Sequence, residues 1–385
     1  MKYHRYQINK TIQQVIGKGH PWVYRDQLSS AADVFESGDW LRLVDGSNQI
    51  KGYGTFESDG LVGIRVFLRG AKPPLPPWWL NQVKTRLSTR KNLRNITNSF
   101  RAIHGENDGL PGITIDVYHD TAVLQTYASS VDGVGRYVAQ IVANELGIKH
   151  LLWRMPHKRV GNEVLSRVRT LRGHPPNLVL MDEGKLKIAV PTREGQKGGM
   201  FLDLRGLRRF LATRQYPRVL NLFSYTGTLG LACETGGSQE VWNVDISKEA
   251  IKWGEKHHSL GKSKWIVANV FDWLKTLPQG PRFDLIIIDP PNMASNQGQV
   301  KTALRQYATL HQKALAHLKP GGTIITACCT SRIQHDAFKR LACDTLRDLN
   351  FKTRLMPEDD HPVGFAEGDY LKIFVFENFK PSKKH

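Results

Sequence analysis

The chain has 385 residues, of which 54 are lysine or arginine and 35 are aspartate or glutamate, so its formal net charge is +19. Hydrophobic residues make up 40% of the sequence and aromatic residues 9%, a composition that excludes wholesale disorder. The excess of positive charge favours a polyanionic partner such as nucleic acid.

No run of about 18 uncharged apolar residues occurs, so we expect no membrane span. The first ten residues are polar and charged and lack the apolar centre of a secretory signal. The four cysteines (Cys233, Cys328, Cys329 and Cys343) form no C-x-x-C pair, so neither a disulfide framework nor a metal site is indicated. These features predict a cytoplasmic protein.

The first 70 residues are predicted to form short strands separated by turns. Strands are expected over Trp40–Val44, Ile50–Tyr53 and Leu61–Phe67, a spacing that suggests a small β-barrel. The proline-rich stretch Ala71–Pro77 can continue neither a helix nor a central strand and predicts a linker. A helix is expected to follow at about Trp78–Leu93.

A second small unit is predicted at about residues 98–190. It is expected to contain a strand pair around His119 and Asp120, one helix and two further strands, namely Ile113–Tyr118, Thr121–Tyr127, Val131–Leu146, His150–Arg154 and Leu186–Val190.

From about residue 215 the pattern changes to a regular alternation of strands and helices. The apolar strands are expected at Val219–Phe223, Val241–Val244, Trp265–Val267, Leu285–Ile288, Thr323–Ala327 and Leu371–Phe376, with helices at 228–235, 247–259, 299–318 and 334–349. Alternation of this kind predicts an α/β fold with a mostly parallel sheet covered on both faces.

The first of these strands leads into a turn that contains Gly227, and a helix follows. A glycine there lets the backbone approach a ligand, and the helix N-terminus presents free N–H groups. The next strand ends at Asp245, where an acid commonly accepts hydrogen bonds from ribose hydroxyls. The turn is neither G-x-G-x-x-G nor G-K-[ST], which favours S-adenosylmethionine over a dinucleotide or a nucleoside triphosphate. Asn269, after the third strand, is placed to contact the adenine amino group or to cap a helix.

The fourth strand ends in Asp289-Pro290-Pro291-Asn292, which brings a rigid acid to the ligand-binding edge of the sheet. At the end of the fifth strand lie two adjacent thiols, Cys328 and Cys329. A thiol there can attack C6 of a pyrimidine and make C5 nucleophilic. Because side chains alternate along a strand, at most one of the two is expected to reach the site.

With these residues in view, the sequence resembles the RlmI-like family of bacterial 23S ribosomal RNA (cytosine-C5) methyltransferases. The resemblance covers nearly the whole chain and rests on several separate segments, Gly19–Val23, Gly105–Asp116, Gly195–Arg205, Leu220–Gly227, Asp289–Pro291, His361-Pro362 and Glu367-Gly368.

The resemblance implies a PUA-type RNA-binding domain over residues 1–72, a linker helix and central α+β domain over 73–190, and a Rossmann-like class I methyltransferase domain with a seven-stranded sheet over 191–385. It implies S-adenosylmethionine as cofactor, held by Phe223, Ser224, Tyr225, Gly227, Asp245, Ile246, Asn269 and Asp289. It also implies contacts to RNA or to the target base by Gln196, Lys197, Phe201, Asp203, Arg205, Pro290 and Pro291.

Two positions depart from the family pattern. Relatives typically carry Ser-Cys-Ser where this chain has Cys328-Cys329-Thr330, a register that assigns the nucleophile to Cys329. Asn269 stands where relatives often have an acid.

The sequence therefore predicts cytosine-C5 methylation of large-subunit ribosomal RNA, with Cys329 as nucleophile and Asp289 as the partner of the base. Two alternatives stay open: methylation of an exocyclic amine, because Asp-Pro-Pro also resembles the signature of amino-group methyltransferases, and a non-catalytic RNA-binding or ribosome-assembly protein. The base that removes the C5 proton is not identified by the sequence. The oligomeric state is also left open, with a homodimer as one option.

Overall fold

The computed structural model describes residues 2–155, 158–160, 163–165, 167–193, 200–277 and 282–377. It divides into two compact units, each considered separately below. Unit 1 comprises Met1–Met181, Val190–Met200 and Asp359–Gly368, and unit 2 comprises Asp182–Ala189, Phe201–Glu358 and Asp369–His385. No helix in the described part of the chain is long and apolar enough to cross a bilayer.

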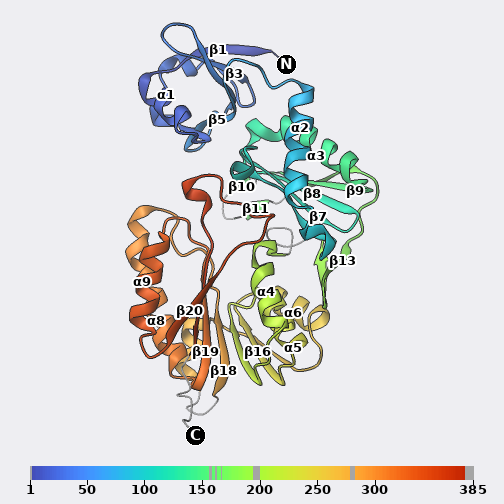
Figure 1. Ribbon diagram of the computed structural model, residues 1–385, viewed down its shortest axis with the longest axis vertical. Coiled ribbons are helices and arrows are strands. Elements are labelled where there is room, and N and C mark those ends of the chain that lie inside the picture. The colour runs from blue at the N-terminus through green and yellow to red at the C-terminus, as the bar shows by residue number, and fades with distance from the viewer. Residues whose placement is uncertain are drawn as a thin grey trace. The chain divides into compact units, whose positions relative to one another are not determined.

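Unit 1 begins with a five-stranded sheet of order β1-β3-β4-β5-β2 (Figure 1). Its strands and the helix that follows β1 are β1 (Tyr3–Gln7), α1 (Lys10–Gly17), β2 (Trp22–Tyr24), β3 (Trp40–Val44), β4 (Ile50–Phe56) and β5 (Val62–Arg69). The three predicted strands are confirmed, whereas β1, α1 and β2 were not predicted. The pairing of β1 with β3 is parallel and joins segments more than thirty residues apart, which local sequence patterns do not reveal.

Helix α2 (Pro76–Thr89) starts within the stretch that the sequence assigned to a linker. Pro76 and Pro77 occupy its first two positions, where the missing N–H is not needed and the fixed φ suits a helix. The predicted start at Trp78 is therefore two residues late. Proline interrupts the interior of a helix but is tolerated in its first turn.

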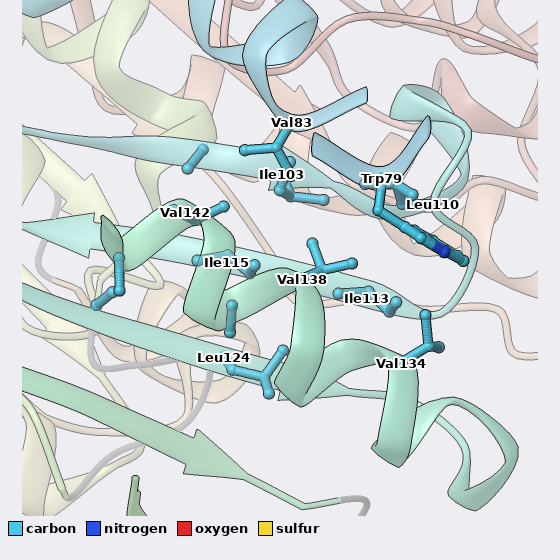
Figure 2. Close-up of a cluster of buried hydrophobic side chains, with 14 of the residues drawn as sticks. Trp79, Val83, Ile103, Leu110, Ile113, Ile115, Leu124, Val134, Val138 and Val142 are labelled. Carbon is cyan, nitrogen blue, oxygen red and sulfur yellow. The ribbon is translucent and has the colours of Figure 1, made fainter. Parts of the chain in front are cut away.

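The second sheet of unit 1 has the order β12-β9-β8-β7-β6. Its strands and the helix beside them are β6 (Ser99–His104), β7 (Ile113–Tyr118), β8 (Thr121–Thr126), α3 (Asp132–Leu146), β9 (His150–Arg154) and β12 (Val168–Arg172). Two separate two-stranded sheets are formed by β10 (Lys158–Val160) with β11 (Glu163–Leu165), and by β13 (Leu178–Glu183) with β14 (Leu186–Pro191), the latter pair including residues 182–189 of unit 2. Figure 2 shows α3 lying on the sheet, with Val138 above Ile113 and Ile115 in a cluster that Trp79 of α2 also joins. Trp40 of β3 belongs to the same cluster, so part of the first sheet joins this core, whereas Leu41 and Leu43 of β3 pack in a separate cluster with Ile12 of α1.

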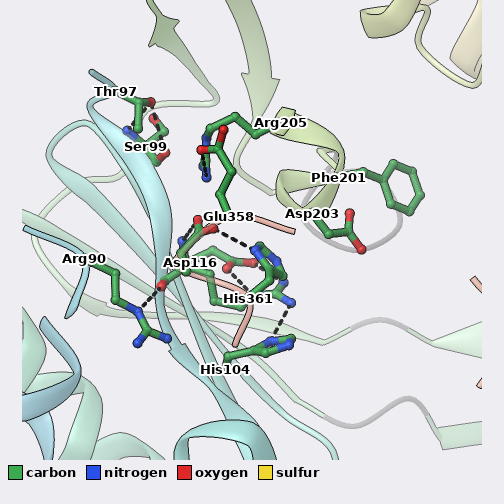
Figure 3. Close-up of polar contacts among 12 residues, drawn as sticks. Arg90, Thr97, Ser99, His104, Asp116, Phe201, Asp203, Arg205, Glu358 and His361 are labelled. Atoms are coloured by element: carbon green, nitrogen blue, oxygen red, sulfur yellow. Dashed lines mark hydrogen bonds and ion pairs between the residues drawn. The ribbon is translucent and has the colours of Figure 1, made fainter. Parts of the chain in front are cut away.

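Two motifs from distant parts of the chain meet within unit 1. Asp360 Oδ2 accepts a hydrogen bond from the backbone N–H of Arg101 at 3.0 Å, and Asn107 Oδ1 accepts one from the N–H of Gly364 at 2.9 Å. The rings of His361 and His104 are 4.8 Å apart and edge-on (Figure 3). Burial, with Arg101 nearby, lowers the pKa of His104 far below its usual value. The segment 359–368 therefore packs against β6, in the second sheet of unit 1.

Unit 2 is built on a seven-stranded sheet of order β17-β16-β15-β18-β19-β21-β20. The first five strands in this order run parallel, and β21 pairs antiparallel with β19 and β20. The elements are α4 (Arg205–Ala212), β15 (Arg218–Leu222), α5 (Thr228–Thr235), β16 (Glu240–Asp245), α6 (Lys248–His257), β17 (Ser263–Val267), α7 (Val270–Thr276), β18 (Phe283–Ile288), α8 (Val300–Leu315), β19 (Leu318–Cys328), α9 (His335–Thr345), β20 (Asn350–Leu355) and β21 (Lys372–Glu377). The α/β class with a mostly parallel sheet is confirmed.

Helices cover both faces of this sheet. In Figure 1, α8 and α9 lie on one side and α4, α5 and α6 on the other. Leu220, Ile286 and Ile324 from three neighbouring strands pack on the first side against Tyr307 of α8 and Phe338 of α9. Both faces of the central strands are therefore buried, as the continuous apolar runs predicted.

A buried charge cluster fixes α4 within unit 2. Arg208 donates two hydrogen bonds to Glu183, at 2.6 and 2.9 Å, and Arg205 Nε lies 3.2 Å from the same carboxylate. Arg205 also points toward Glu358, at 3.9 Å (Figure 3). Both arginines are fully buried. The predicted contact of Arg205 with RNA is therefore corrected, because its guanidinium is enclosed by protein carboxylates and has no exposed surface.

We expect Glu183→Gln to lower the free energy of unfolding by about 3 kcal/mol, because it leaves two buried guanidinium groups without their carboxylate. Asp182→Asn is the matched control: Asp182 is the neighbouring acid, pairs with Lys187 and is 44% exposed, so its loss should cost less than about 0.5 kcal/mol. Urea unfolding followed by circular dichroism measures both variants. Equal stabilities would contradict the role given to the Glu183 cluster.

Candidate functional site

The candidate site of unit 2 is set by three parallel strands that end at the same level. Leu222 of β15 pairs with Ile288 of β18, and Ile288 pairs with Thr326 of β19. The residues that follow these strands are Phe223, Asp289 and, after two more residues of β19, Cys329. The carboxyl edge of the sheet therefore gathers the predicted glycine turn, acid and thiol.

The turn after β15 has an unusual backbone. Phe223 has φ 59°, Tyr225 has φ 50° and Gly227 has φ 73°, so two non-glycine residues adopt the left-handed conformation. Hydrogen bonds hold this shape: Ser224 N–H donates to the carbonyl of Val244 at 3.0 Å, and Tyr225 N–H donates to Asp245 Oδ2 at 2.8 Å. Strain of this kind persists only where the surroundings enforce it, and it is often found at ligand sites.

Gly227 is required by its neighbours as well as by its φ. A Cβ at this position would collide with the indole ring of Trp265, and a Cβ at Gly230 would collide with Asn243. The sequence predicts that Gly227 lets the backbone approach a ligand. In the structure, the atoms that exclude a side chain at Gly227 belong to the half-buried ring of Trp265.

Three features beside this turn suit a bound nucleoside. The carboxylate of Asp245 accepts N–H groups of Tyr225 and Ser247 at 2.8 Å each, which fixes its orientation. The next residue, Ile246, is 69% exposed and presents an apolar side chain beside this acid. Ser224 Oγ is buried, yet it has no hydrogen-bond partner in the described part of the chain.

Asn269 is an exposed N-cap of α7. Its Oδ1 accepts the N–H groups of Phe271 at 2.9 Å and Asp272 at 3.4 Å. Helix capping thus uses the oxygen atom that would accept a hydrogen bond from the adenine amino group. The adenine contact of Asn269 stays a prediction.

The predicted acid and thiol meet at the centre of the edge. Asp289 is half-buried, Pro290 is buried and Pro291 is exposed. The half-buried thiol of Cys329 lies 3.8 Å from the carbonyl oxygen of Pro290. The sequence predicted a thiol beside the Asp-Pro-Pro turn, and the structure brings Cys329 to this position.

Cys328 points the other way. It is fully buried in the core beneath α8 and α9. Burial raises the pKa of the nearby Tyr307 well above its usual value, and negative charge on Cys328, Cys329 or Asp289 raises it further. Tyr307 is therefore neutral. Of the two adjacent thiols, Cys329 is the one that borders the Asp289-Pro290-Pro291 turn.

The segment before α4 adds two side chains to the same edge. The ring of Phe201 is edge-on to Tyr225, with centroids 5.5 Å apart, and Asp203 Oδ2 accepts a hydrogen bond from the Tyr370 hydroxyl at 2.6 Å. Both Phe201 and Asp203 are half-buried. Gln196 and Lys197, which the sequence also assigned to the substrate, lie outside the described residues.

Sequence reasoning missed one charged residue at this edge. Lys372 lies on β21, directly across from Cys328 of β19, and is buried. Its signal in the sequence is a single lysine within the apolar run Leu371–Phe376, a position where a charge needs a local reason.

Comparison with known proteins gives two family matches. Residues 154–376 match the model of a family described as S-adenosylmethionine-dependent methyltransferase, and residues 7–69 match a PUA-like domain.

Similar sequences and structures agree with these matches. The sequence is 30% identical to "Ribosomal RNA large subunit methyltransferase I" of Enterobacter sp. (strain 638), over 96% of this chain and 98% of the relative. It is 29% identical to the protein of the same name from Alteromonas mediterranea, over 93% and 94%. A Streptococcus mutans structure described as a SAM-dependent methyltransferase has a TM-score of 0.81 at 20% identity, over 97% of this chain and 99% of that one. A methyltransferase complexed with SAH has a TM-score of 0.82 at 20% identity, with the same coverage.

Proposed function

The chain belongs to the S-adenosylmethionine-dependent methyltransferases, and from this premise we propose that it methylates carbon 5 of a cytosine in large-subunit (23S) ribosomal RNA. The observation that carries the choice of C5 is the thiol of Cys329, 3.8 Å from the Pro290 carbonyl at the edge of the sheet. Methylation of an exocyclic amine needs no thiol at this place. The RNA class is inferred from the names of the relatives and from the net charge of +19.

The residues around the turn after β15 fit the cofactor. Ser224 offers a buried hydroxyl without a partner among the described residues, Asp245 an oriented carboxylate for the ribose, and Ile246 an exposed apolar surface for the adenine. We assign the remaining contacts to Phe223, Tyr225, Gly227, Asn269 and Asp289. The cofactor supplies an electrophilic methyl group.

Gly227→Ala is expected to weaken binding of S-adenosylhomocysteine at least about tenfold. The new methyl group would collide with Trp265 and displace the turn, an effect that adds to the strain of a left-handed alanine. Gly261→Ala is the matched control: its φ is +87° and a Cβ there meets open space. Isothermal titration calorimetry compares the two variants. Equal affinities would show that this turn does not form the cofactor site.

The chemistry then follows from Cys329 and Asp289. The Cys329 thiolate adds to C6 of the cytosine, a carbon–sulfur bond forms, and the displaced π electrons make C5 nucleophilic. After C5 gains the methyl group, a base removes the C5 proton, the electron pair restores the C5–C6 double bond, and the thiolate leaves. Asp289 accepts a hydrogen bond from the base edge, and the rigid Pro290-Pro291 turn keeps its carboxylate in place. The cytosine has to leave any base stack to reach this edge.

We expect Cys329→Ala to lower methyl transfer to ribosomal RNA by at least about 1,000-fold, because covalent activation of C5 is lost. Cys328→Ala is the control at the neighbouring, core-facing thiol, and it should retain most of the activity. Transfer of tritium from labelled cofactor to ribosomal RNA measures both. Full activity of Cys329→Ala would refute the covalent mechanism.

Nucleoside mass spectrometry of the methylated RNA separates the remaining alternatives. We expect 5-methylcytidine. An N-methylated nucleoside would favour the amino-group reaction that Asp289-Pro290-Pro291 also suits, and absence of any methylated product together with absence of cofactor binding would favour a non-catalytic RNA-binding protein.

We further propose that RNA is held by residues 1–72, including the PUA-like region, and that residues 191–385 carry out catalysis, with 73–190 between them. Phe201, Asp203, Pro290 and Pro291 are proposed to contact the target base. Gln196 and Lys197 remain predictions, as do cytoplasmic location and a homodimer.

A further inference from the structure

Lys372 is a buried lysine that lies level with Cys328 in the sheet and whose side chain ends at Thr330, the residue after the candidate nucleophile. It is 1% exposed. Its Nζ donates hydrogen bonds to the carbonyl of Thr330 at 2.9 Å and to the carbonyl of Tyr370 at 3.0 Å. Thr330 directly follows Cys329, so this ammonium group is fixed at the end of β19 where the thiol lies.

The positive charge of Lys372 lacks a dedicated carboxylate. No ion pair with Lys372 occurs among the described residues, and Asp369, the acid nearby in the sequence, is paired with Arg354 at 2.7 Å. Burial of an ammonium group without an anion is unfavourable, because two carbonyl dipoles compensate its charge only in part. A further negative charge nearby would stabilise the ammonium form.

The titratable and charged side chains around Lys372 and Cys329 come from five segments. Cys328 and Cys329 lie on or beside β19, Tyr307 on α8, Asp289 after β18, Lys372 on β21, and the Arg354–Asp369 pair on and beside β20 and β21. Burial lowers the pKa of Lys372, whereas negative charge on Cys328, Asp369 and Cys329 raises it.

Few of these groups can supply the missing anion. Tyr307 stays neutral because of its raised pKa. Cys328, directly across from Lys372 in the sheet, is fully buried beneath α8 and α9 and has no contact with solvent. Asp369 already has Arg354. Cys329 is half-buried and can release its proton to solvent.

We propose that Lys372 is a positioning residue that stabilises Cys329 as a thiolate, a role that rests on the proposed covalent mechanism. The thiol proton passes to water, and the resulting thiolate is the form that adds to C6. Lys372 also offsets the repulsion between this thiolate and the Asp289 carboxylate. When the carbon–sulfur bond breaks at the end of the reaction, the thiolate returns to the same cation.

The test is the pH dependence of alkylation of Cys329 by iodoacetamide, followed peptide by peptide with mass spectrometry so that the four cysteines are resolved. In the unmodified full-length protein the midpoint should lie below the ordinary thiol value of about 8.5. In Lys372→Met it should rise by at least one pH unit, which lowers the alkylation rate at pH 7 about tenfold. Lys372→Arg, which keeps the charge, should restore most of this rate.

Lys352→Met on β20 is the matched control, because Lys352 is 65% exposed and pairs with Glu377 away from the thiol. Its alkylation profile should match that of the unmodified protein. A purely structural role of Lys372 would change thermal stability without moving the midpoint. An ordinary midpoint in the unmodified protein, or an unchanged midpoint in folded Lys372→Met, would overturn the proposal.

Failure of this proposal can be told apart from failure of the proposed function. Full methyl transfer by Cys329→Ala would refute the covalent mechanism whatever the alkylation profile. Conversely, an unchanged midpoint in Lys372→Met combined with inactive Cys329→Ala would leave the mechanism intact and remove only the role of Lys372.

Discussion

The parallel pairing of β15, β18 and β19 is the constraint on which the rest of the site depends. Ile286, Ile287 and Ile288 are completely buried, on both faces of the sheet. A shift of one residue in β18 would bring Asp284 or Asp289, at the two ends of this apolar run, into the place of a fully buried apolar side chain, so the register is strongly specified. With Ile288 level with Thr326, the residue after β18 is Asp289, and the first side chain beyond β19 on the non-core side is Cys329. Packing therefore fixes the distance between acid and thiol.

Much of this half of the fold could be predicted from the sequence because its signals are local. Apolar runs located the central strands, and two-residue alternation separated Cys329 from Cys328. Element ends were less predictable. The sequence predicts that β15 includes Phe223, but the strand ends at Leu222 because Phe223 has a left-handed backbone conformation. A residue other than glycine gives no signal in the sequence for this conformation.

Features that depend on distant partners could not be predicted. Arg205 lies in a basic run that looks like a solvated face, and its burial is explained by contacts of α4 with Glu183 of β13 and with Glu358. The segment containing Asp360 belongs by sequence to the catalytic half but packs in unit 1. The sequence shows Lys372 as a charge in an apolar strand, but the role proposed for it depends on its proximity to the end of β19, where Cys329 lies. In each case the deciding contact joins residues far apart in the chain, and no periodicity encodes it.

The proposed cofactor turn and the proposed nucleophile thus share one physical origin. The turn after β15 keeps two strained residues because hydrogen bonds to the end of β16 and the fit of Gly227 against Trp265 leave it no alternative. The thiol is placed by the end of a strand that is buried on both faces. A site held by core packing loses little entropy when it orders a substrate, which is what the proposed positioning of a methyl group, a thiol and one flipped base requires. Among the described residues of the proposed site, Phe201 and Asp203 come from a segment outside the sheet, and its contacts with Tyr225 and Tyr370 join it to the same edge.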